Sequence, residues 1–86
     1  MDLQIQPSAQ EMPIREKRMA LAGREGCYRL FERGSRFFIE ITLGADRSSA
    51  DVGSSFYRAA YLYDLLVEGE VTPCTLQDIL EDFALA

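Results

Sequence analysis

The sequence predicts an α+β domain in which a three-stranded antiparallel β-meander precedes two helices packed on one of its faces. Three observations predict this β-β-β-α-α order. Residues 27–33 and 36–43 are rich in aromatic and β-branched side chains and are separated by Gly34-Ser35, a two-residue hairpin signal. From residue 56 onward apolar residues recur every three or four positions instead of every two, which indicates helices after strands. The chain has 86 residues, of which 48% are hydrophobic, enough to bury one modest core.

The central hairpin is predicted by the residues that a turn at Gly34-Ser35 brings opposite one another. One face receives the pairs Glu32 with Phe37, Leu30 with Ile39 and Tyr28 with Ile41, and the other face receives Phe31 with Phe38 and Arg29 with Glu40. Each favourable pair contributes about 0.2–1 kcal/mol. A slip of one residue would move every side chain to the wrong face, so the register is predicted together with the strands.

The N-terminal part of the chain leaves alternatives. Residues 1–12 are predicted to be a flexible tail, although the alternation in residues 3–6 also suits an added edge strand. Residues 13–22 could form a short helix between Pro13 and Gly23. With residues 23–26 as a loop, however, Leu21 lies opposite Tyr28, Met19 opposite Leu30, Lys17 opposite Glu32 and Glu16 opposite Arg33. In this register apolar side chains lie opposite apolar ones and acidic side chains lie opposite basic ones, so we favour a strand over residues 13–22. Residues 13–86 then form a single domain.

The C-terminal half is predicted to hold a loop and two helices. Residues 44–55 carry glycine, aspartate and a cluster of serines, which is typical of a solvated loop. Ser54 or Ser55 is expected to cap a helix over residues 56–68 that ends at Gly69. Thr72-Pro73 is expected to open the second helix, with threonine as the cap. The predicted core comprises Leu30, Ile39, Ile41, Leu62, Leu66, Leu76, Leu80 and Phe83.

Composition restricts the class of function. The chain has no histidine, the commonest general base and metal ligand, and its two cysteines are too far apart in sequence for a zinc knuckle. It has no secretory or long apolar segment, so we expect a soluble cytoplasmic protein without a membrane partner. The net charge of −5 is divided unevenly, with +4 in residues 13–36 and −7 in residues 37–86. This polarity favours attraction between the two halves or between two copies of the chain.

The candidate chemical groups favour structural roles. Cys74 lies in the first turn of a predicted helix, where amide dipoles could lower its pKa, but a structural cysteine is the better interpretation. Asp78, Glu81 and Asp82 could offer two carboxylates to one ion, but a solvated acidic face explains them better. The tyrosines of the first helix are interpreted as core edge and amphipathic surface. We therefore expect no enzyme activity, no catalytic residue, no metal site and no cofactor.

The outer face of the predicted sheet is the candidate contact surface. Phe31 and Phe38 should project away from the helices, among the arginines Arg18, Arg29, Arg33 and Arg36. Exposed aromatic and arginine side chains are typical of protein interfaces. We therefore predict a non-catalytic protein-interaction or regulatory module that binds a protein partner or forms a homodimer through Phe31, Phe38, Arg18, Arg29 and Arg36. The alternatives are single-stranded nucleic acid stacked on the phenylalanines, which the acidic total disfavours, and coverage of the phenylalanines by residues 1–12.

The closing run Val71-Thr72-Pro73-Cys74-Thr75-Leu76-Gln77-Asp78-Ile79-Leu80-Glu81-Asp82-Phe83 resembles the end of a small uncharacterised family, a domain of unknown function, from anaerobic Gram-positive (Clostridia-type) bacteria. That family has similar paired strands upstream, here Tyr28-Arg29-Leu30 and Phe37-Phe38-Ile39-Glu40-Ile41. The resemblance spans residues 14–83. It implies a fold and a bacterial source, and it implies no activity.

Overall fold

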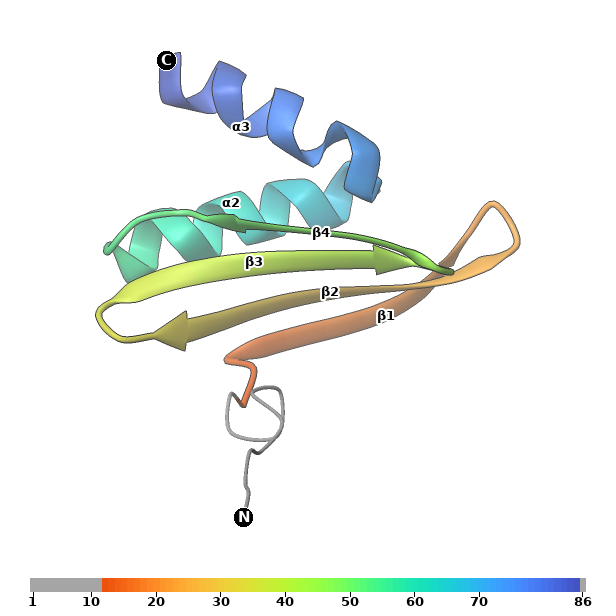
Figure 1. Ribbon diagram of the computed structural model, residues 1–86, viewed down its shortest axis with the longest axis horizontal. Helices are drawn as coiled ribbons and strands as arrows, with labels where there is room; N and C mark the ends of the chain where they lie inside the picture. The colour runs from red at the N-terminus through yellow and green to blue at the C-terminus, as the bar shows by residue number, and fades with distance from the viewer. Residues whose placement is uncertain (1–11, 86) are drawn as a thin grey trace.

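The computed structural model describes residues 12–85, with side chains described through residue 82. It has four strands, β1 (Arg15–Leu21), β2 (Arg24–Arg33), β3 (Arg36–Leu43) and β4 (Asp46–Asp51). They are followed by α2 (Phe56–Glu68), the 3₁₀ turn η1 (Pro73–Thr75) and α3 (Leu76–Leu85). The strands form one antiparallel sheet in the order β1-β2-β3-β4, and α2 lies across one of its faces (Figure 1). The predicted α+β class is confirmed.

The number of strands was predicted wrongly, because the sheet has four strands and not three. β4 lies inside the segment 44–55 that was expected to be a loop. Its serines and aspartates have low strand propensity, and it is an edge strand that pairs on one side only. Its inward positions are small, since Ser48 lies opposite Ile41 and Ala50 opposite Ile39. These small side chains hide the alternation that would have predicted the strand.

The central hairpin has the predicted register. Leu30 lies opposite Ile39 and Tyr28 opposite Ile41, while Phe31 lies opposite Phe38 on the other face. Gly34 has φ +65°, the left-handed conformation that a type II′ turn requires at its first central residue. Glycine adopts this conformation without the steric cost that a Cβ would impose, so the turn and the cross-strand pairs agree.

β1 is a strand, as we favoured, but its register differs from the prediction by four residues. Met19 lies opposite Gly26 instead of Leu30, and Lys17 lies opposite Tyr28 instead of Glu32. The turn is the pair Ala22-Gly23, with φ +54° and +77°. Left-handed alanine costs about 1–2 kcal/mol, so this pair is not a usual hairpin sequence and the longer loop was expected instead. Because four is even, each β1 side chain keeps its predicted face.

The helices begin and end close to the predicted residues. Ser55, one of the two serines expected to cap this helix, caps α2 by accepting a hydrogen bond from the Arg58 amide at 3.3 Å. The second helical segment differs, because η1 precedes α3 and Thr72 makes no capping hydrogen bond to the backbone. Its hydroxyl instead lies 3.2 Å from the Thr75 hydroxyl. Thr72 therefore holds the predicted N-cap position, with Pro73 in the first turn, but it precedes a 3₁₀ turn and makes no capping hydrogen bond through its side chain.

The core lies between α2 and the inner faces of β2 and β3, while η1 and the start of α3 pack against β4. Its fully buried large side chains are Tyr28, Leu30, Ile39, Ile41, Leu66 and Leu76. The predicted core residues Leu30, Ile39, Ile41, Leu62, Leu66 and Leu76 are confirmed as buried. Leu80 is only partly buried, and the Phe83 side chain lies outside the described part of the structure.

Replacing Ile39 by alanine tests this core. Ile39 is fully buried at the centre of the sheet, so Ile39→Ala should lower the free energy of unfolding by about 2–5 kcal/mol. The matched control is Ile79→Ala on α3, where the side chain is 39% exposed and the change should stay within about 0.5 kcal/mol. Urea unfolding measures both. Equal small losses would contradict the assignment of the two faces.

Candidate functional site

The outer face, meaning the sheet face opposite α2, carries a stacked aromatic pair on its two central strands. The rings of Phe31 and Phe38 lie 5.8 Å apart at an interplanar angle of 16°. The Arg33 guanidinium lies over both, 5.6 Å from the Phe31 centroid and 5.2 Å from the Phe38 centroid. Both phenylalanines are partly buried. They face away from the helices as predicted, but they are less exposed than expected.

Ion pairs cross this face from β1 to β4. Arg29 donates to Glu16 at 2.7 Å and to Glu40 at 3.1 Å, and Arg47 lies 3.7 Å from Glu40. The hydrogen bond from Arg29 lowers the pKa of the Glu16 carboxyl. Cys27 lies beside this network, where burial raises the pKa of its thiol. The Cys27 side chain is buried, and its thiol donates to the Glu16 carboxylate at 3.8 Å.

A second ion pair joins β3 to β4. Arg36 donates to Asp51 at 2.7 Å, and Asp51 also accepts a hydrogen bond from the Gly53 amide at 2.8 Å. The hydrogen bond from Arg36 is the main cause that lowers the pKa of the Asp51 carboxyl. Arg36 shares its face and strand with Phe38, two residues away. Its guanidinium therefore borders the aromatic pair while holding the edge strand.

The predicted contact residues do not form one cluster. Phe31, Phe38 and Arg36 share one end of the outer face, and Arg29 lies in the central ion-pair network. Arg18 lies towards the β1 edge, 4.0 Å from Glu16. The residue that was undervalued is Arg33, which was expected only to flank the rings. Its place two positions after Phe31 on the same strand puts both side chains on one face, and this signal could have found it.

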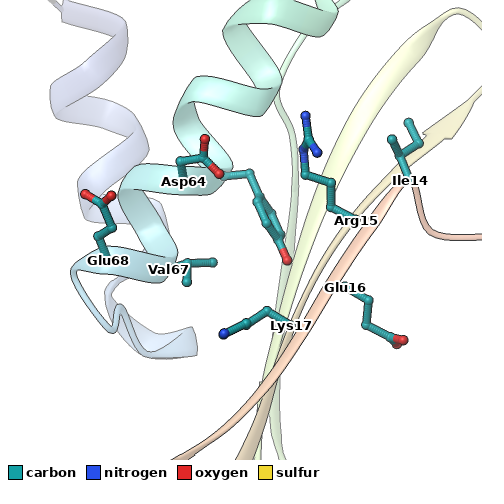
Figure 2. Close-up of a pocket in the computed structure, with 8 residues that line it drawn as sticks. Ile14, Arg15, Glu16, Lys17, Asp64, Val67 and Glu68 are labelled. Carbon is teal, nitrogen blue, oxygen red and sulfur yellow. The ribbon is translucent and has the colours of Figure 1, made fainter.

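A separate cavity of about 500 Å³ opens between β1 and α2. Its lining residues are Ile14, Arg15, Glu16, Lys17, Tyr63, Asp64, Val67 and Glu68. Figure 2 shows the cations of Arg15 and Lys17 on β1, and the carboxylates of Asp64 and Glu68 on α2. None of these four groups forms an ion pair with another of them within 4.0 Å. The cavity is therefore bordered by charges of both signs that do not pair with one another across it.

Tyr63 is the buried polar residue of this cavity, and its hydroxyl serves the fold. It donates to the Tyr28 carbonyl at 2.9 Å, while the Tyr28 hydroxyl donates to the Val71 carbonyl at 2.9 Å. Burial raises the pKa of Tyr63 to about 12. These two bonds connect α2 to β2, and β2 to the segment before η1. Tyr63 is thus a core-edge residue, as interpreted from the sequence.

The remaining chemical candidates stay apart from one another. Cys74 is exposed and lies 3.4 Å from the Thr72 hydroxyl. Within residues 12–85, no three acidic or cysteine side chains gather closely enough to hold a metal ion. No helix in this part of the chain is long and apolar enough to cross a membrane. The described features that remain as candidates for a site are the outer face of the sheet and the cavity between β1 and α2.

Comparison with known proteins adds no relative. No family model, curated protein or solved structure matches this chain. The resemblance of residues 14–83 to a clostridial family therefore stays a prediction. Function is inferred from the chain's own residues.

Replacing Tyr63 by phenylalanine tests the tie between α2 and β2. A tyrosine whose pKa rises from 10.0 to about 12 on folding stabilises the protein fully below pH 10, and this stability is lost as the pH rises towards 12. Tyr63→Phe should cost about 0.5–1.5 kcal/mol at neutral pH and should lose less stability than wild type above pH 10. Chemical unfolding across this range measures both curves. A constant difference between them would show that the Tyr63 hydroxyl is not buried in the folded state.

Proposed function

We propose that this protein is a non-catalytic protein-interaction module of the cytoplasm whose contact surface is the outer face of the sheet. The observation that carries the proposal is the stack of Phe31 and Phe38 beneath the Arg33 guanidinium. Aromatic and arginine side chains supply most of the binding energy at protein interfaces. The two free cysteines, Cys27 and Cys74, suit a reducing compartment.

The rigidity of the support favours binding at this face. Phe31 and Phe38 stand on the two central strands, and each strand pairs on both sides. The inner residues next to them, Leu30 and Ile39, are fully buried under α2. Side chains held in this way lose little conformational entropy when a partner binds. The aromatic pair can therefore act as a preorganised anchor.

The charges of the outer face suit a protein partner of mixed charge, and a second copy of the chain is the first candidate. The face carries five arginines and four carboxylates: Arg18, Arg29, Arg33, Arg36, Arg47, Glu16, Glu25, Glu40 and Asp51. When a surface carries both positive and negative side chains, two copies related by a two-fold axis can place arginines of one copy opposite carboxylates of the other. The carboxylates also provide specificity against partners with only negative charge.

Single-stranded nucleic acid is the alternative ligand of the same face. Stacked phenylalanines with a neighbouring arginine are suited to bases. The carboxylates of Glu16, Glu40 and Asp51 would lie close to the phosphates, and they already pair with arginines. The electrostatic gain on which such binding depends is therefore reduced, and a protein partner is the better supported ligand.

A double substitution tests the proposal. Phe31→Ser with Phe38→Ser should leave the fold intact, because neither side chain belongs to the face covered by α2. Wild type should associate with increasing concentration in sedimentation equilibrium, and this association should survive moderate salt because desolvated aromatic contacts carry it. The double variant should sediment as a monomer. The matched control, Tyr57→Ser with Leu65→Ser, changes two apolar side chains of α2 and should associate like wild type.

Other outcomes separate the alternatives. Binding of wild type to a labelled oligothymidylate, with affinity falling steeply as salt rises, would favour nucleic acid as the ligand. The third alternative is that residues 1–12 cover Phe31 and Phe38; residues 1–11 lie outside the described part of the chain. If this alternative is correct, wild type stays monomeric and a variant lacking residues 1–12 associates. A wild-type protein that stays monomeric and ignores the oligonucleotide, with no change on deletion of the tail, would overturn the proposal.

A further inference from the structure

The helices carry most of the large apolar side chains that the structure leaves in solvent. Among the residues with described side chains, seven large apolar ones are exposed, and the helical ones are Phe56, Tyr57, Tyr61, Leu65 and Ile79. Phe31 and Phe38 of the outer face are not among the seven. The helix layer therefore offers a second apolar surface on the opposite side of the molecule from the outer face.

Three of these residues form a stripe along α2. Tyr57, Tyr61 and Leu65 follow one another at intervals of four residues, so they lie on one side of the helix. They are 85%, 57% and 41% exposed. The buried residues of α2, Ala59, Leu62, Tyr63 and Leu66, occupy the side that faces the sheet. The stripe extends for about 12 Å along the helix axis, which is the length of two turns of a partner helix.

Negative charge predominates in the two helices, and two carboxylates of α2 border the stripe. Residues 56–82 contain six carboxylates and one guanidinium, a net charge of −5. Asp64 and Glu68 lie on α2 beside the stripe, and Asp78, Glu81 and Asp82 lie on α3. α2 has no basic residue in its last turn, so the partial negative charge of its C-terminus adds to the potential of Asp64 and Glu68. The helix layer is acidic, whereas the outer face has more arginines than carboxylates.

We propose that the α2 stripe binds a basic amphipathic helix from a partner protein. The apolar side of that helix would cover Tyr57, Tyr61 and Leu65, and its lysine or arginine side chains would lie against the neighbouring carboxylates. This is the helix-on-apolar-surface mode of peptide recognition, in which residues at intervals of three and four supply the anchors. The charges speed encounter and reject acidic partners, while the desolvated aromatic side chains supply the affinity.

The charges around the α2 stripe favour a basic partner helix over a second copy of this chain. A second α2 would bring its own carboxylates against Asp64 and Glu68 and would be repelled. The outer face of a second copy is basic enough to attract the stripe, but it offers a flat sheet instead of a helix. Contact between these two different faces would not close on itself and would produce open-ended assemblies, which the experiment below can detect.

A pair of designed peptides tests the proposal on the full chain. The probe is a fluorescein-labelled peptide of about 14 residues, long enough to form a helix on a surface, with leucines on one side and lysines on the other. The second peptide has every lysine replaced by glutamate. Fluorescence anisotropy should show binding of the lysine peptide and none of the glutamate peptide. Equal binding of the two peptides, or no binding of the lysine peptide, would overturn the proposal.

Substitutions locate the binding. Tyr57→Ser with Leu65→Ser should weaken binding of the lysine peptide about tenfold or more, the loss expected for an interface anchor. Circular dichroism and the unfolding midpoint should be close to those of wild type, because both residues are exposed. Phe31→Ser with Phe38→Ser should bind the peptide like wild type. The proposal for the outer face and the proposal for the α2 stripe can therefore be disproved independently of one another.

A matched pair of charge variants completes the design. Asp64→Asn with Glu68→Gln should weaken binding and reduce its dependence on salt. Glu25→Gln with Glu32→Gln removes the same charge from exposed positions of β2 and should have little effect. Equal effects of the two pairs would mean that the peptide senses net charge only, which overturns the site. Association of wild type with itself that is lost in Tyr57→Ser with Leu65→Ser would assign the stripe to a second copy instead.

Discussion

The register of the central hairpin is the constraint on which the rest of the structure depends. Gly34 supplies the left-handed first residue of the turn, and this turn decides which side chains of β2 and β3 share a face. With Leu30 opposite Ile39, the apolar residues face α2 and are buried. The aromatic pair and its arginines are then left together on the outer face. The same turn therefore determines the core and the candidate contact surface.

The two faces of the molecule differ in charge, and this difference follows from the order of the chain. β1 and β2 come from the basic part of the sequence, residues 13–36, and the helices come from the acidic part, residues 37–86, which also supplies β4 and most of β3. On the sheet, carboxylates such as Glu16 and Glu40 are used to hold Arg29. On α2, Asp64 and Glu68 form no ion pair with Arg15 or Lys17 across the cavity. A partner of mixed charge suits the first face, and a basic partner suits the second.

The sequence was sufficient where local turn chemistry and side-chain pairing agree. The turn and register of the hairpin around Gly34 and the bounds of α2 were predicted, although β2 begins at Arg24, three residues before the predicted strand. The register of β1 was missed because Ala22 adopts a conformation that alanine seldom adopts. Gly26, which was read as part of a loop, lies within β2, where an added Cβ would come within 3.3 Å of the Thr42 carbonyl oxygen. A side chain at position 26 would therefore crowd the neighbouring strands, which no local pattern reveals.

The candidate surfaces were predictable only in part, because exposure depends on tertiary contacts. Alternation along β2 was enough to predict that Phe31 faces away from the helices, but not that Arg33 would lie over its ring. The apolar residues of α2 were assigned mainly to the core, and the structure buries only one side of the helix. Helical spacing placed Tyr63, and neither Tyr57 nor Tyr61, in the apolar stripe of this helix, but only the structure shows how far Tyr57 and Tyr61 are exposed.

The register itself is most directly tested by nuclear Overhauser contacts between the α protons of β2 and β3. The Gly44 amide donates to the Glu25 carbonyl, so odd-numbered residues of β2 form the hydrogen-bonded pairs with β3 and even-numbered residues form the close, non-hydrogen-bonded pairs. Strong α-proton contacts should therefore join Leu30 to Ile39 and Tyr28 to Ile41. Contacts displaced by one residue, such as Leu30 to Phe38, would exchange the two faces and contradict the assignment of both the core and the contact surface.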